Sequence, residues 1–333
     1  MSSLKFSNLP ILLLSGFLAA CGGSSSSDDV SAGNLTANNR LFGAPRAWYD
    51  DTFDCAPKSL SWTDVNDWFY QLQADDYETL ANSKYDLLVI DGDPVVYDLN
   101  RNVVERMKCG GDGDKYLISY LSVGQAENYR DYWQTDWGVG NPSWIAYADE
   151  FWLGDFYVRY WEPEWQEILL NRVDAVVDKG FDGLYLDVID AYAFFEAERP
   201  DAREEMRVLI ATIAERARTR SGNPDFGIFV QNAEELIEIV GPTWIEPLTG
   251  IGKEEPFYWA TDDKVQEDQR FWNDYYLAQW VAAGKLVLSV DYVTRPAFIN
   301  DAYSLAEQHG FVPLTLTQTA LDKFEIVPGH EPD

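Results

Sequence analysis

The chain has 333 residues and sets 56 acidic against 25 basic side chains, a formal charge of -31 at pH 7. Nucleic-acid binding needs clustered lysine and arginine, so nucleic acid is excluded as an expected partner. Two histidines and three cysteines are too few for a His- or Cys-based metal site and leave almost no base for Ser-His-Asp catalysis. With 13 Trp, 19 Tyr and 17 Phe for a large core, the composition predicts a globular protein. Its chemistry must rest on carboxylates, hydroxyls, amides and aromatic rings, without a metal or cofactor.

The N-terminal segment is typical of an export signal. Lys5 precedes an apolar run from Ile11 to Ala20, which is too short to span a bilayer and predicts a signal peptide over residues 1–20. Leu18-Ala19-Ala20-Cys21 resembles a bacterial lipobox, which implies lipidation of Cys21; an ordinary signal peptide is the alternative. Residues 21–47 are rich in Ser, Gly, Asp and Asn and predict a flexible tether. We therefore expect an exported lipoprotein held at a membrane only by its N-terminal lipid.

Two cysteines remain once Cys21 is assigned to the lipid. Cys55 and Cys109 form an even pair in a compartment that favours oxidation, which predicts a disulfide. The alternative is two separate buried thiols, because the sequence alone gives no distance between them.

Residues 48–333 show no repeat or second linker and are expected to form one domain. Eight short runs rich in Val, Ile, Leu and Tyr are candidate strands. They are Phe69 to Gln73, Tyr85 to Asp91, Tyr116 to Val123, Gly183 to Val188, Gly227 to Asn232, Thr243 to Leu248, Leu286 to Tyr292 and Phe311 to Thr315.

Helical patterns lie between several of these runs. Apolar residues from Trp165 to Val177 follow helical spacing and end before Gly180, and further helices are expected over 202–220 and 262–283. Alternating strands and helices predict a (β/α)8 TIM barrel, with a doubly wound open sheet as the alternative. The Trp-rich stretch from Trp133 to Trp161 fits neither element and predicts an insertion over one end of the barrel.

Polar residues recur at the ends of the candidate strands. Alternation places Asp187 on the face opposite Leu184 and Leu186, so Asp187 is expected to point into the barrel at its C-terminal end, where barrel enzymes carry their sites. The same reasoning selects further strand-end residues: Asp91, Tyr120, Ser122, Ser289, Asp291 and Asn232. Any single carboxylate here could instead cap a helix, and Asp190 is the strongest candidate for a cap. Together they predict a carboxylate-lined cleft.

A cleft with acids and aromatic rings but without histidine suits glycoside hydrolysis. That reaction needs two carboxyl groups, one to protonate the leaving oxygen and one to attack the sugar or activate water. Metal-dependent hydrolysis on an all-oxygen site is the alternative, although no EF-hand spacing is present. The Gly250-Ile251-Gly252-Lys253 segment lacks the third glycine of a dinucleotide fingerprint.

Several ordered motifs between about Trp68 and Phe324 resemble those of glycoside hydrolase family 114, the endo-alpha-1,4-polygalactosaminidase family. They are Trp68 to Gln73, Tyr85 to Asp91, Tyr120 to Arg130, Gly180 to Asp187, Gln231-Asn232, Gly252 to Tyr258, Val290-Asp291-Tyr292 and Gly310 to Pro313. The resemblance implies a barrel enzyme that cuts within alpha-1,4-linked galactosamine polymers, with Asp187 as nucleophile or base and Glu254 as acid. Spacing alone would not select Glu254, expected in a loop, over Glu246 or Glu255.

One motif departs from the family pattern. Family members often have Gly-Glu-Ala-Glu where this chain has Gly124-Gln125-Ala126-Glu127, so a charge that could help to bind a cationic sugar is lost. Candidate substrate-binding residues are Gln73, Asp91, Tyr120, Gln125, Arg130, Asp190, Asn232, Tyr258 and Asp291; for Arg130 an ion pair that holds a loop is the alternative.

Aromatic residues of the insertion are further candidates for lining a sugar groove. They are Trp133, Trp137, Trp144, Trp152 and Trp161. The expected partner is a polysaccharide, cationic if the family substrate applies. A non-catalytic polysaccharide-binding surface lipoprotein is the alternative function, and the presence of both Asp187 and Glu254 favours the enzyme.

Overall fold

The computed structural model describes residues 40–332 except 42, 54–57, 75, 94–98, 111–113 and 260. The predicted signal peptide, Cys21, most of the predicted tether and Cys55 lie outside the described residues. Cys109, which follows helix α3 (Arg101–Lys108), is disulfide-bonded. No helix within the described ranges is long and apolar enough to cross a membrane.

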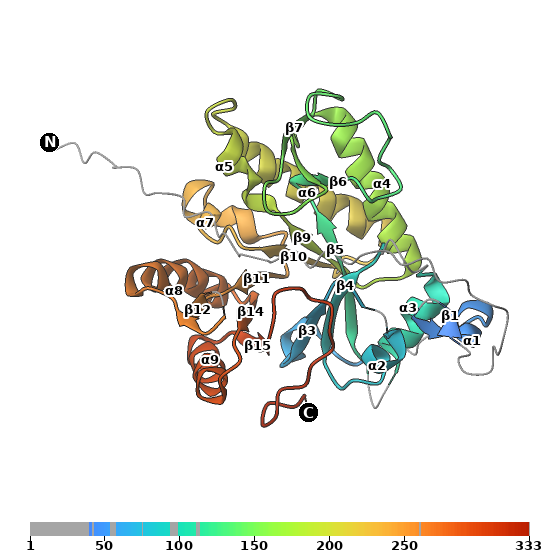
Figure 1. Cartoon of the computed structure of the whole chain (residues 1–333), viewed down its shortest axis with the longest axis vertical. Helices are drawn as coiled ribbons and strands as arrows, with labels where there is room; N and C mark the ends of the chain where they lie inside the picture. Colours follow the sequence, from blue (N-terminus) through green and yellow to red (C-terminus); the bar gives the residue numbers. More distant parts are fainter. Residues whose placement is uncertain are drawn as a thin grey trace, which may run out of the picture.

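Eight parallel strands form the central barrel (Figure 1). Around the barrel they are β3 (Trp68–Gln71), β4 (Leu87–Asp91), β5 (Tyr116–Ser122), β9 (Gly183–Asp187), β10 (Gly227–Gln231), β11 (Gly250–Glu254), β14 (Leu286–Tyr292) and β15 (Val312–Leu316). The first and last strands approach each other, since the Trp68 indole N–H donates to the Val312 carbonyl at 3.0 Å. This order confirms the predicted (β/α)8 barrel rather than an open sheet.

Helices surround the barrel (Figure 1). Besides α3 they are α1 (Arg46–Asp50), α2 (Tyr77–Ala81), α4 (Pro163–Lys179), α5 (Tyr192–Phe195), α6 (Ala202–Ser221), α7 (Leu236–Ile239), α8 (Glu267–Ala282) and α9 (Pro296–His309). Helix α4 ends as predicted at Gly180, whose left-handed φ of 91° suits glycine. Helix α8 begins at Glu267 rather than Asp262, because Asp263–Lys264 (β13) pairs with Tyr258–Trp259 (β12).

The Trp-rich stretch belongs to a small antiparallel sheet beside the barrel. Its strands are β6 (Gln125–Glu127), β7 (Ile145–Ala148) and β8 (Asp155–Val158), with β8 in the centre. The Trp133, Trp137, Trp144 and Trp165 rings contact one another in series at centroid distances of 5.0–5.6 Å. The candidate groove tryptophans are therefore mainly packing residues, except Trp152, which is 55% exposed.

The predicted sixth strand, Thr243 to Leu248, is wrong: residues 242–245 form a 3-10 helix, and the strand is β11. β11 has glycines at its inward positions. Because glycine has a low strand propensity, the sequence does not predict a strand there. A Cβ at Gly250 would lie 2.6 Å from the Phe229 ring, and one at Gly252 only 1.7 Å from the Tyr185 hydroxyl oxygen. Glycine is needed here because aromatic rings fill the space that a side chain would occupy.

Gly252→Ala should lower the free energy of unfolding by at least about 2 kcal/mol, since the new methyl must displace the buried Tyr185 ring. Chemical denaturation would measure this change. Gly138→Ala is the matched control, because no heavy atom lies within 4 Å of a Cβ placed there. Equal stability of both variants with the wild type would contradict the packing described for β11.

Candidate active site

The C-terminal ends of β9, β10, β11 and β14 bring polar side chains together inside the barrel. Parallel register aligns Tyr185 with Phe229, Gln231 with Gly252, and Glu254 with Val290. Residues in register share a face, so Asp187, Gln231, Glu254 and Tyr292 all face the interior. The predicted catalytic residues Asp187 and Glu254 therefore lie on two strands separated by β10, and Glu254 ends a strand rather than lying in a loop.

Three side chains donate hydrogen bonds to the Glu254 carboxylate. Gln231 Nε2 donates to Oε2 at 2.6 Å, Asn232 Nδ2 to the same oxygen at 3.4 Å, and the Tyr292 hydroxyl to Oε1 at 2.6 Å. Tyr70 in turn donates to Gln231 Oε1 at 3.1 Å, which fixes the amide orientation. Because each partner of the carboxylate donates, the site is arranged to hold Glu254 in one position as an acceptor.

Asp187 lies close enough to Glu254 for the two charges to interact. Burial, followed by the charge of Glu254, raises the pKa of Asp187 to about 7. Two hydrogen bonds to Asp187 lower its pKa in part: one comes from the Val188 backbone N–H at 2.7 Å and the other from the Tyr120 hydroxyl. Asp187 is therefore about half protonated at neutral pH, as expected for a buried carboxyl group beside a like charge.

The residues that follow three of these strands adopt left-handed backbone conformations. Val188 after β9 has φ 56°, Asn232 after β10 has φ 57°, and Glu255 after β11 has φ 53°. This region is unfavourable for residues with a side chain, and most of all for β-branched valine. Strained backbone conformations cluster at functional sites. Their presence beside Asp187, Gln231 and Glu254 therefore indicates that this end of the barrel carries the functional site.

Asp91 and Arg130 form a buried ion pair. The Arg130 Nη1 lies 2.7 Å from Asp91 and its Nε 2.7 Å from Glu127, and the arginine side chain is only 6% exposed. These contacts tie the loop after β6 to the end of β4. Asp91 and Arg130 were predicted to bind substrate; because they neutralise each other, we assign both as positioning residues.

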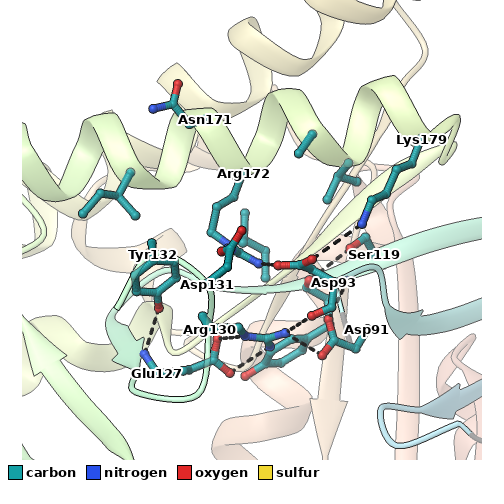
Figure 2. Close-up of a pocket in the computed structure, with 15 residues that line it drawn as sticks. Asp91, Asp93, Ser119, Glu127, Arg130, Asp131, Tyr132, Asn171, Arg172 and Lys179 are labelled. Carbon is teal, nitrogen blue, oxygen red and sulfur yellow. Dashed lines mark hydrogen bonds and ion pairs between the residues drawn. The ribbon is translucent and has the colours of Figure 1, made fainter. Parts of the chain in front are cut away.

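A cavity of about 270 Å³ adjoins this ion pair, between the ends of β4 and β5 and helix α4 (Figure 2). Figure 2 shows Arg172 and Lys179 reaching from α4 toward Asp93, with which both form ion pairs. Asp187 and Glu254 do not line this cavity, but Tyr120 does. Tyr120 also hydrogen-bonds to Asp187, so this one side chain contacts both the cavity and the carboxylate pair.

Gln125 occupies the position at which the sequence departs from the family pattern. Its Nε2 donates to Asp149 at 2.6 Å, and Asp149 also accepts the backbone N–H groups of Phe151 and Trp152 at 2.7 and 3.0 Å. A glutamate at 125 would place a second carboxylate against buried Asp149. The amide at 125 and the carboxylate at 149 therefore form a matched pair that holds the hairpin between β7 and β8.

Several other predicted substrate-binding residues do not face the carboxylate pair. Asp291 is on the outer face of β14, 2% exposed, where it accepts the N–H groups of Phe257 and Tyr258 at 3.0 and 2.8 Å. The Tyr258 hydroxyl donates to Asp301 on α9 at 2.6 Å. Gln73 is exposed and donates to the Ala320 carbonyl at 3.2 Å. The predicted inward position of Asp291 is wrong, because alternation does not show which face of a strand is inward and the register with β11 places Asp291 on the outer face.

The other predicted residues lie nearer to the pair. Tyr120 and Asn232 contact it directly, and Asp190 follows β9 in a short 3-10 helix. Sequence reasoning missed Gln231, Tyr292 and Tyr70 as partners of the carboxylate site, although all three lie in motifs that carry the family resemblance. Among the described residues no group of three or more His, Cys, Asp or Glu side chains is arranged to hold a metal ion.

Comparisons with known proteins connect this geometry to a family. A model described as glycoside-hydrolase family GH114 matches residues 54–332. A protein from Deinococcus radiodurans is 37% identical over 72% of this chain and 75% of its own length, and one from Thermotoga maritima is 32% identical over 80% and 85%. Both relatives are described only as uncharacterized proteins.

Solved structures show the same fold. The glycoside hydrolase domain of PelA from Pseudomonas aeruginosa superposes with a TM-score of 0.59 at 21% identity, covering 78% of this chain and 96% of that domain. Ega3 from Aspergillus fumigatus, in complex with galactosamine, gives 0.55 at 17% identity, covering 76% and 91%.

Arg130→Met should destabilise the fold by about 3 kcal/mol, because it leaves the buried carboxylates of Asp91 and Glu127 without their partner. Urea denaturation at pH 7 would measure the change. Arg207→Met removes an exposed ion pair with Glu204 and should change stability by less than about 1 kcal/mol. If the two variants are equally stable, Arg130 does not hold the loop.

Proposed function

The chain belongs to glycoside-hydrolase family GH114, and we propose that it cuts within alpha-1,4-linked, galactosamine-containing polysaccharide by a two-carboxylate mechanism. The observation that carries this proposal is the pair of Asp187 and Glu254 at the ends of β9 and β11. Burial and the charge of Glu254 raise the pKa of Asp187 to about 7, so a protonated carboxyl group is well populated in the site at neutral pH. A protonated and an ionised carboxyl group are what glycosidic bond cleavage requires.

The choice of an amino-sugar polymer rests on charge and on a relative. The chain has a formal charge of -31, and a negative field raises the encounter rate of a polymer that carries ammonium groups. Ega3, which shares the fold, has been solved with galactosamine. Both observations support a cationic substrate.

Within the pair we assign Glu254 as the acid and Asp187 as the nucleophile or base, following the family resemblance. Because the raised pKa places the proton on Asp187 in the free protein, these roles require the proton to pass from Asp187 to Glu254 before the glycosidic bond breaks. The acid protonates the glycosidic oxygen as the bond to the leaving sugar breaks. Asp187 either bonds to the anomeric carbon, to be displaced later by water, or removes a proton from the attacking water. Tyr120, Gln231 and Tyr292 hold the two carboxylates in place through the hydrogen bonds described above.

Purified protein incubated with deacetylated alpha-1,4-galactosamine polymer should release internal oligosaccharides, detected by mass spectrometry. Asp187→Asn and Glu254→Gln should each reduce the rate by at least about 1000-fold, because each removes one of two required groups. Asp291→Asn is the matched control: its carboxyl lies outside the barrel interior, and a folded variant should keep most of the activity.

An aryl glycoside with a good leaving group separates the two roles, because its departure needs no acid. Glu254→Gln should keep most of its activity on such a substrate while Asp187→Asn loses it. If Asp187→Asn instead keeps its activity while Glu254→Gln loses it, Asp187 is the acid and Glu254 is the nucleophile or base. Binding of the polymer without release of any product would instead favour a non-catalytic polysaccharide-binding protein.

A further inference from the structure

A row of exposed aromatic side chains follows helix α8. Phe271 is 60%, Trp272 42% and Tyr275 47% exposed. Trp272 stacks on Tyr276 at a centroid distance of 5.9 Å and an angle of 25°, and meets Tyr275 edge to face. The opposite side of the helix, with Asn273, Leu277 and Trp280, is buried. A cluster of exposed rings of this kind is unusual for a surface without a binding role.

The aromatic row is joined to acidic residues on α7, which lies beside α8 (Figure 1). The Tyr276 hydroxyl hydrogen-bonds to Glu238. Burial, this hydrogen bond and the charges of Glu238 and Glu235 raise the pKa of Tyr276 to about 12. Rings and carboxylates are therefore interleaved where the two helices meet.

The acidic residues continue from α7 to the carboxylate pair. Glu235 accepts a hydrogen bond from Tyr192. Desolvation and the charge of Glu235 raise the pKa of Asp190 to about 6, and the charge of Asp190 acts in turn on Asp187. Charge interactions thus link Glu235, Asp190 and Asp187, and the Lys253 ammonium acts on Glu235 and Asp190 in the opposite direction.

The charge around the row is negative. Helix α8 adds Glu267 and Asp268 in its first turn to the α7 acids, whereas its Asp274 is paired with Arg270 at 3.6 Å and lies 3.4 Å from His309. Aromatic faces attract cations, and neighbouring carboxylates add Coulomb attraction. Sugar rings that carry ammonium groups match both features, since they offer an apolar face and a positive charge.

We propose that Phe271, Trp272, Tyr275 and Tyr276, together with Glu235 and Glu238, form an outer binding surface for a second stretch of the cationic amino-sugar polymer. This inference rests on the proposed function for its ligand. The outer binding surface holds one stretch of the polymer while another stretch of the same polymer reaches Asp187 and Glu254. Long polymers gain from this second contact, and oligosaccharides too short to reach both places do not.

The test measures binding by the full chain carrying Glu254→Gln, which prevents cleavage. Adding Trp272→Ala and Tyr275→Ala should raise the Kd for long deacetylated galactosamine polymer about tenfold in calorimetry at low salt. Glu238→Gln should also raise this Kd, but should leave the Kd for the N-acetylated, uncharged polymer unchanged.

Val208→Ala is the control, because Val208 is an apolar side chain that is 46% exposed on α6, away from both binding places. The inference is overturned if the Trp272 and Tyr275 changes leave the Kd unaltered, or if Val208→Ala weakens binding as much. It is also overturned if sedimentation shows dimers that these changes dissociate, because the surface then serves self-association. Cleavage by the wild type decides the proposed function independently of these binding results.

Discussion

The close approach of Tyr185 to Gly252 inside the barrel is the constraint on which the site depends. Tyr185 is fully buried, and its hydroxyl oxygen occupies the space that any side chain at 252 would need. With glycine there, β11 can run close beside the aromatic interior and end with Glu254 facing inward. Tyr70, Tyr120 and Tyr292 then reach the carboxylates or their amide partner from three other strands.

A second consequence is that hydroxyl and amide groups, rather than an ion pair with arginine, hold the two carboxylates. Neutral donors position Glu254 without cancelling its charge. That charge acts on Asp187 and keeps a proton in the site near neutral pH. The arginine of this end of the barrel, Arg130, is used instead to fasten the loop after β6 to Asp91 and Glu127.

The sequence predicted the barrel, helix α4 and the inward position of Asp187, because the spacing of apolar residues along a strand or helix shows which side chains are buried. The prediction fails where burial and propensity disagree: β11 contains two glycines and lacks the pattern of a strand, so only the family resemblance points to Glu254. Alternation in β14 predicts the wrong inward face, because Ser289 and Asp291 are polar but lie on the outer face of the barrel. The contacts of Gln125 with Asp149 and of Arg130 with Asp91 join residues distant in sequence, which no local pattern reveals.

The central claim is that burial and the charge of Glu254 keep Asp187 partly protonated at neutral pH. Infrared difference spectra of wild type against Asp187→Asn, recorded from pH 4 to 9, measure this proton directly. We predict a protonated carboxyl band assigned to Asp187 that disappears with an apparent pKa near 7, and that shifts to lower pH in Glu254→Gln because the charge of Glu254 is gone. A band that disappears below about pH 5 in the wild type, or that is unmoved in Glu254→Gln, would contradict the account.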